Sequence, residues 1–125
     1  MTRINCVPVG TLSDKHLGAE YRELPRIYGL VRATIARGAT PANYAHHTHY
    51  TLGKGHCLFF YTRLAWLDQR FREIARECDG RGRRVSFPTP PSIGIPEAWF
   101  GWWEPTEEAL RVNAQRIAER TRAII

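Results

Sequence analysis

The stretch DKHLGAEYRELPRIYGLVRATIAR, residues 14–37, contains the first helical pattern along the chain. Its apolar side chains recur every three or four positions, at Leu17, Tyr21, Leu24, Tyr28, Val31 and Ile35. That spacing predicts an amphipathic helix with one face in the core. Thr11 or Ser13 is positioned to cap its start, and Gly38 follows its end. Pro25 lacks a backbone donor and is expected to kink the helix.

Two later segments repeat this pattern. From about His56 to Cys78 the apolar positions are Phe60, Leu64, Leu67, Phe71, Ile74 and Cys78, and Gly80 and Gly82 follow. From about Glu107 to the end of the chain they are Leu110, Ala114, Ile117 and Ile124. The connecting segments, 38–55 and 83–105, have no strand-like alternation. We therefore predict an all-α fold, with residues 1–125 forming a single domain of three main helices and long ordered loops.

Length and composition agree with one domain that has its own core. The chain has 125 residues, of which 43% are hydrophobic and 24% charged, so it is neither disordered nor a membrane protein. Its apolar runs, such as residues 57–61, are too short to span a bilayer, and residues 1–5 do not resemble a signal peptide. Cys6, Cys57 and Cys78 are odd in number and widely spaced, so we expect reduced thiols and a cytoplasmic protein.

Charge gives the first indication of a partner. Eighteen basic residues against twelve acidic ones give a net charge of +6, and sixteen of the eighteen are arginines. Arginine suits phosphate recognition, so a DNA or RNA partner is one interpretation. A soluble basic protein from a GC-rich genome would show the same bias.

One helix face is strongly basic. Lys15, Arg22 and Arg26 lie opposite Leu17 at 100° per residue, flanked by His16, Glu20 and Glu23. This pattern is typical of a solvated face with i,i+4 ion pairs, but it also fits a phosphate-binding surface with a carboxylate among cations. Arg116 and Arg120, four residues apart on the third helix, could extend such a surface.

Other motifs give weaker indications of function. His46, His47 and His49 could hold zinc, but no second ligand cluster follows, so we expect no metal. No phosphate-binding loop, dinucleotide fingerprint or serine-nucleophile motif is present. Trp99, Trp102 and Trp103 could stack on bases, although tryptophans among prolines more often pack within a loop.

Several runs resemble the phage-type pyrimidine-dimer DNA glycosylases, the UV-repair enzymes also called endonuclease V. They are MTRIN at residues 1–5, HL at 16–17, AEYRELPR at 19–26, LG at 52–53, GH at 55–56, FFY at 59–61, EC at 77–78 and RG at 81–82, with Leu64 and Leu67. The register holds without gaps to about residue 82 and resumes, shifted by one, through the third helix.

The resemblance implies an all-α DNA-repair glycosylase that excises cyclobutane pyrimidine dimers and cleaves the strand by β-elimination at the abasic site. It implies Thr2, exposed by removal of Met1, as the nucleophile that forms a Schiff base, and Glu23 as the key carboxylate. The implied DNA-binding residues are Arg3, His16, Arg22, Arg26, Arg116 and Arg120, the last in place of a family lysine. Lys15 stands where the family has glutamine on the DNA-facing side, and we count it among the DNA-binding residues.

Amine chemistry agrees with this assignment. A Schiff base at C1′ needs a neutral amine. An α-amine has a pKa near ~7.7–8.0 and a lysine near ~10.4, so the α-amine is neutral far more often at pH 7. Lys15 and Lys54 are the only lysines, so Thr2 is the best of three candidates. The chemistry needs no metal or cofactor.

The expected partner is double-stranded DNA with UV photoproducts or abasic sites, bound by a cytoplasmic, nucleoid-associated monomer with no membrane role. Two alternatives stay open. One is a related glycosylase or lyase retuned to another damaged base. The other is a non-catalytic basic protein that binds distorted DNA. The chain ends at residues 122–125 without the aromatic, basic tail of the phage enzyme, and residues 46–49 diverge from it.

Overall fold

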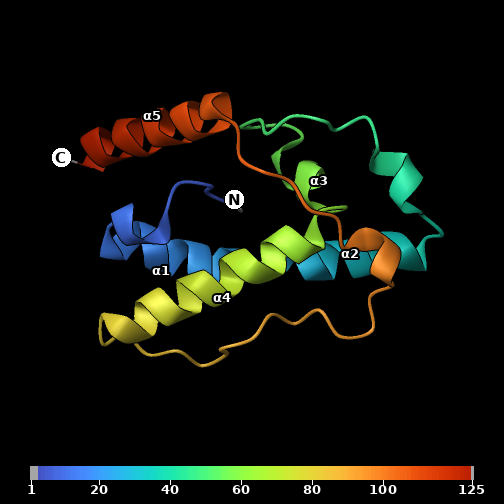
Figure 1. Ribbon diagram of the computed structural model, residues 1–125, viewed down its shortest axis with the longest axis horizontal. Coiled ribbons are helices and arrows are strands. Elements are labelled where there is room, and N and C mark those ends of the chain that lie inside the picture. The colour runs from blue at the N-terminus through green and yellow to red at the C-terminus, as the bar shows by residue number, and fades with distance from the viewer. Residues whose placement is uncertain (1–2, 125) are drawn as a thin grey trace.

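The computed structural model describes residues 3–124, and side chains within residues 3–121. The α-helices, shown in Figure 1, are α1 (Asp14–Glu23), α2 (Arg26–Ala36), α3 (His56–Phe60), α4 (Leu64–Gly80) and α5 (Glu107–Ile124). Short 3-10 turns occur at Val9–Thr11, Pro41–Tyr44 and Glu97–Trp99. Across residues 3–124, β pairing is limited to an isolated antiparallel bridge between Arg63 and Phe100. The predicted all-α class, with three main helical segments, is confirmed.

The first predicted helix is two helices with a break at Pro25. The Oγ of Ser13 accepts a hydrogen bond from the His16 amide at 3.2 Å, so Ser13 is the N-cap. Because Pro25 has no amide hydrogen, the regular bonding pattern stops there, and the Ile27 amide donates to the Leu24 carbonyl at 3.1 Å. The expected kink is therefore confirmed as a full boundary between α1 and α2.

The continuous helix predicted from about His56 to Cys78 is wrong at residues 61–63, where α3 ends before α4 begins. The backbone of Gly101 inserts at this point. Its amide donates to the Thr62 carbonyl at 3.0 Å, and its carbonyl accepts from the Trp66 amide at 3.4 Å. The amide and carbonyl of one residue in a distant loop thus replace the helical bond between Trp66 and Thr62.

This insertion makes a prediction about Gly101. A Cβ at this position would lie 2.3 Å from the Thr62 carbonyl oxygen, which belongs to the backbone and cannot rotate away. Gly101→Ala is therefore expected to lower the free energy of unfolding by about 1–3 kcal/mol, as overpacking does. Urea denaturation followed by circular dichroism measures it. Gly29→Ala, on α2 where an added Cβ would enter open space, is the control and should not destabilise. An equal midpoint in both variants would contradict the insertion.

The core forms where α4 packs across α1, as Figure 1 shows. Every position of the second predicted stripe is buried, from Phe60 to Cys78. The third stripe was predicted in part wrongly, because Ala114 is exposed while its neighbour Asn113 is fully buried. Asn113 takes the buried position because its side chain forms hydrogen bonds with the N-terminal segment, as described below. The side chain of Ile124 lies outside the described residues.

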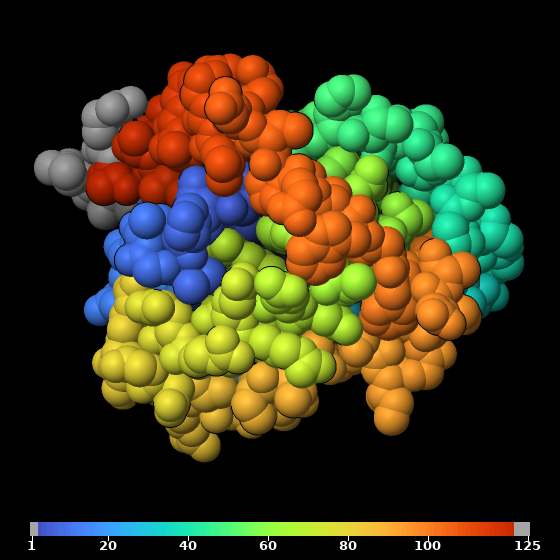
Figure 2. Space-filling view, viewed as in Figure 1, coloured from blue at the N-terminus to red at the C-terminus, as the bar shows by residue number. Residues whose placement is uncertain are grey.

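The long loops are ordered and packed. In Figure 2 the segment after α4, coloured gold to orange, runs along the lower edge of the molecule. Trp99 is buried, and Trp103 stacks on Tyr50 with ring centroids 5.9 Å apart. Only Trp102 of this loop's three tryptophans is substantially exposed. The cluster is therefore mainly loop packing.

Two further expectations can be compared with the structure. No disulfide joins Cys6, Cys57 and Cys78, all of which lie within the described residues. Among residues 3–124, no helix combines the length and apolar character needed to cross a membrane.

Candidate active site

The N-terminal segment, residues 3–7, belongs to no helix or sheet. Side chains from other parts of the chain form hydrogen bonds with its backbone instead. The Arg3 amide donates to Oε1 of Glu23 at 3.1 Å, and the Ile4 amide donates to Nε2 of His56 at 2.8 Å. The Ile4 carbonyl accepts from the hydroxyl of Tyr50 at 2.9 Å. Oδ1 of Asn113 accepts from the amides of residues 6 and 7, at 2.7 and 3.1 Å. Buried backbone groups must be paired, so these side chains fix the path of the chain into the site.

A buried ion pair between α1 and α4 also holds this segment in position. Glu20 on α1 and Arg70 on α4 are both almost fully buried and share two hydrogen bonds, of 2.9 and 3.1 Å. Nδ2 of the Asn5 side chain donates to Oε1 of Glu20 at 2.8 Å, and Oδ1 of Asn5 accepts from Nδ2 of Asn113 at 2.7 Å. One network therefore joins the N-terminal segment, α1, α4 and α5. The expectation that Glu20 lies on the basic surface is wrong for its carboxylate, because that group pairs inward.

His56 is held as a neutral acceptor. Its Nδ1 lies 2.7 Å from the Thr51 carbonyl, so Nδ1 carries the hydrogen and Nε2 is left to accept from Ile4. Burial lowers the pKa of His56, and the charge of nearby Arg3 lowers it further, while the hydrogen bond to Thr51 opposes them. Protonation would place a second donor opposite the Ile4 amide and break that contact.

This arrangement predicts a pH dependence of stability. In the unfolded chain His56 is protonated near pH 6.5, whereas in the folded chain its protonation requires a lower pH. The contribution of His56 is thus complete above pH 6.5 and is lost as the pH falls below it. We expect His56→Gln, whose amide can also accept and donate, to show a shallower loss of unfolding free energy between pH 7 and 5. Parallel pH profiles from urea denaturation would contradict a neutral His56.

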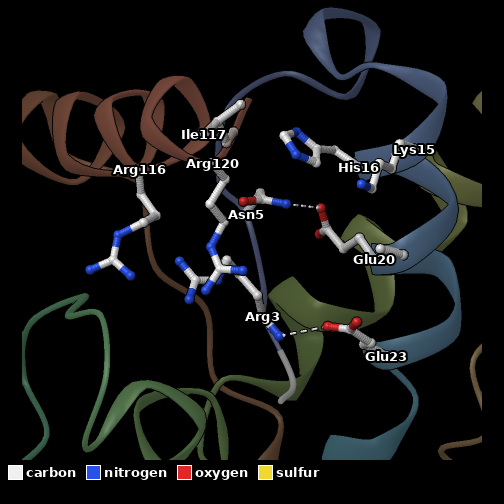
Figure 3. Close-up of a pocket in the computed structure, with 10 residues that line it drawn as sticks. Arg3, Asn5, Lys15, His16, Glu20, Glu23, Arg116, Ile117 and Arg120 are labelled. Atoms are coloured by element: carbon white, nitrogen blue, oxygen red, sulfur yellow. Dashed lines mark hydrogen bonds between the residues drawn. The ribbon is translucent and has the colours of Figure 1, made fainter. Parts of the chain in front are cut away.

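A cleft of about 370 Å³ opens between the N-terminal segment, α1 and α5. Figure 3 shows its walls: Lys15, His16 and Glu23 on α1, Arg3 on the N-terminal segment, and Arg116 and Arg120 on α5. The side chains of Arg3 and Arg120 turn toward the same space, opposite Glu23. The cleft thus brings together six of the predicted site residues.

Basic side chains outnumber carboxylates in the cleft, and Glu20, which also reaches its lining, is paired with Arg70. The pKa of Arg3 is lowered by burial and then by the facing guanidinium groups of Arg120 and Arg116. Like charges close together in a partly buried site attract an anion, which relieves their repulsion. The half-buried Glu23 lies at the edge of this cluster. A phosphate-rich ligand suits such a cleft.

Other predicted residues lie elsewhere. Arg22 and Arg26 are exposed beside the cleft and do not line it. Thr2, the predicted nucleophile, lies outside the described residues, although its neighbour Arg3 lines the cleft. In the histidine segment the rings of His46 and His47 lie 4.1 Å apart. No three metal-ligating side chains come together within the described chain.

Sequence reasoning missed the residues that support the site. They are Tyr50, His56, Arg70 and Asn113. The ring of His56 orients the backbone of the N-terminal segment. One signal was available, because Asn113 is a polar residue in the buried stripe of Ala109 and Ile117. For Arg70, the available signal is its position on α4 among the buried residues Leu67, Phe71 and Ile74.

A basic cleft with a carboxylate at its edge, on a small helical protein, defines a class: enzymes that bind a polyanion and carry out acid–base chemistry on it. A family model described as pyrimidine dimer DNA glycosylase matches residues 1–89, well over half of the chain. The chain belongs to the pyrimidine dimer DNA glycosylase family. Membership supports a DNA-repair enzyme whose polyanion is UV-damaged DNA. Arg116 and Arg120 lie beyond the matched range and join the cleft through the fold.

Proposed function

We propose that this protein is a glycosylase with abasic-site lyase activity, which excises cyclobutane pyrimidine dimers through the α-amine of Thr2. One observation carries the proposal: the Arg3 amide lies 3.1 Å from Oε1 of Glu23. That amide nitrogen is covalently bonded to the carbonyl carbon of Thr2. Glu23 therefore bonds to the residue that directly follows the candidate nucleophile in the chain.

The reaction begins with removal of Met1, which the small side chain of Thr2 permits. The neutral amine attacks C1′, the bond from C1′ to the base nitrogen breaks, and the base leaves with that electron pair and takes up a proton. The C1′–O4′ bond then breaks, O4′ takes up a proton, and a Schiff base remains between Thr2 and C1′. Loss of a C2′ proton then expels the 3′ phosphate by β-elimination, and water hydrolyses the imine to release the enzyme.

Glu23 has a role at each stage. As the base leaves, positive charge develops on the sugar, and an ionised carboxylate stabilises it. The same carboxylate moves a proton during imine formation and accepts the C2′ proton for elimination.

The cations of the cleft bind the DNA backbone. Arg3, Arg116 and Arg120, with Lys15 and His16, neutralise phosphates around the lesion, and Arg22 and Arg26 extend contact along α1. A dimer within a duplex is reached by bending the DNA and extruding a nucleotide, which is cheapest at a damaged pair. The proposed partner is thus duplex DNA with a dimer or an abasic site.

Strand cleavage tests the proposal. Three duplexes, with one cis-syn thymine dimer, one abasic site or no lesion, are incubated with the protein. We expect cleavage of the first two alone. An extra glycine before Thr2 should abolish cleavage of both and leave binding to undamaged duplex unchanged. Lys15→Met, which removes the lysine that lines the cleft, should still cleave.

Other outcomes would contradict the proposal in distinct ways. Cleavage of the abasic duplex alone would indicate a lyase with different base specificity. Tight binding without any cleavage would indicate a non-catalytic protein that recognises distorted DNA. Cleavage that survives the added glycine would remove Thr2 from the mechanism.

A further inference from the structure

A pair of arginines covers a glycine on α1, outside the cleft. Gly18 is buried although it has no side chain, because two guanidinium groups lie over it. The Nη2 of Arg83 lies 2.7 Å, and the Nη1 of Arg22 3.4 Å, from the position that a Cβ on Gly18 would take. Two charged groups from different parts of the chain therefore meet above one point of the helix.

Arg83 is held in place by the fold. The Gly82 backbone has a positive φ of 76°, which turns the chain at the end of α4, and the Arg83 amide donates to the Cys78 carbonyl at 2.9 Å. Four residues later, the Phe87 amide donates to the hydroxyl of Tyr21 at 2.8 Å, and that hydroxyl donates to the Phe87 carbonyl at 2.9 Å. The loop from Arg83 to Phe87 is thus bonded to α4 at its start and to α1 at its end.

The charge of the pair is not balanced locally. Within residues 3–121, neither Arg22 nor Arg83 forms an ion pair or a side-chain hydrogen bond with another residue. Two like charges that converge without a carboxylate between them repel each other, and an anion placed between them removes that cost. Both arginine side chains are exposed, so an anion can reach them.

We propose that Arg22 and Arg83 together bind a backbone phosphate of the DNA, at a position separate from the cleft. This inference rests on DNA as the ligand of the proposed function. At 100° per residue, Arg22 lies close to the direction of Lys15, at the rim of the cleft, and Gly18 lies further from the cleft. Neither Arg22 nor Arg83 lines the cleft.

Salt-dependent binding to undamaged duplex tests the site, because each phosphate contact contributes about 0.9 to the slope of log affinity against log salt. Arg83→Ala is expected to lower that slope by about one and to weaken binding about tenfold at low salt. The control is Arg76→Ala, an exposed arginine of α4 with the same change in charge, whose slope should match the parent. Equal slopes for Arg83→Ala and the parent, or equal losses in both variants, would overturn the proposal.

Gly18→Ala provides a second test that leaves both charges in the protein. Its Cβ would clash with Arg83 and displace the guanidinium, while alanine is a better helix former than glycine. The variant should reproduce the reduced slope of Arg83→Ala, and the double variant should lose nothing more. A parent-like slope for Gly18→Ala, or additive losses, would contradict a site above Gly18. Because undamaged duplex is used, these results are independent of whether the protein excises dimers.

Discussion

Glu23→Gln is expected to lower the rate of strand cleavage at a thymine dimer by a factor of about 10²–10⁴, the usual contribution of a positioned acid–base group. Glutamine keeps the length of the side chain and an oxygen that can accept from the Arg3 amide. It loses the negative charge that stabilises the sugar cation and the ability to take the C2′ proton. Single-turnover cleavage of a dimer-containing duplex measures the change.

A matched control separates this effect from a general change in charge. Glu108→Gln alters an exposed carboxylate on α5 that pairs with Arg111 and does not line the cleft. It should cleave at the parent rate. DNA binding by Glu23→Gln should be at least as tight as the parent, because one negative charge leaves a positive site. Parent-like cleavage by Glu23→Gln would exclude the carboxylate from the mechanism.

Arg70→Met is expected to lower the free energy of unfolding by about 3–5 kcal/mol, the usual cost of breaking a buried ion pair. The substitution leaves the carboxylate of Glu20 buried without its main partner. It also removes the donor to the Val7 carbonyl, which Arg70 contacts at 2.5 Å. Since small proteins are stable by about 5–15 kcal/mol, urea denaturation should show a large shift in midpoint.

Arg72→Met is the control, because Arg72 is an exposed residue on the same helix with the same charge. Its midpoint should stay close to the parent value. Where Arg70→Met remains folded, we also expect slower cleavage, because its network holds residues 5–7 and hence the chain that leads to Thr2. Equal midpoints for the two variants would mean that the buried pair does not support the fold.

Local signals in the sequence predicted the helices well. The apolar spacing from Leu17 to Ile35, the serine cap at residue 13 and the break at Pro25 each depend on residues within a turn or two of one another. The stripe from Phe60 to Cys78 was likewise correct in every position. Such features follow from helix geometry and proline chemistry, which need no tertiary information.

Tertiary contacts explain what the sequence did not predict. The break after α3 is made by Gly101, whose peptide comes from a loop nearly forty residues away along the chain. The inward turn of Glu20 depends on Arg70, and the burial of Asn113 depends on the amides of residues 6 and 7. In each case a polar group is buried because a distant partner satisfies it, which a periodic pattern cannot reveal.

The candidate site was predictable in its residues and less so in its arrangement. Charge pattern and resemblance together predicted Glu23 and the cations of α1 and α5, and six predicted residues line one cleft. The pattern alone did not separate Lys15 and His16, which line the cleft, from Arg22 and Arg26, which lie beside it. It also gave no signal for Arg83, a loop residue whose guanidinium lies over Gly18 of α1.

Borohydride trapping tests the central claim, that the α-amine of Thr2 attacks C1′ at a pyrimidine dimer. The protein is incubated with a duplex that carries one cis-syn thymine dimer, the imine is reduced, and the crosslinked peptide is mapped by mass spectrometry. We predict a single adduct on the amine of Thr2, with Met1 absent. An adduct on Lys15, or none despite tight binding to the same duplex, would contradict the claim.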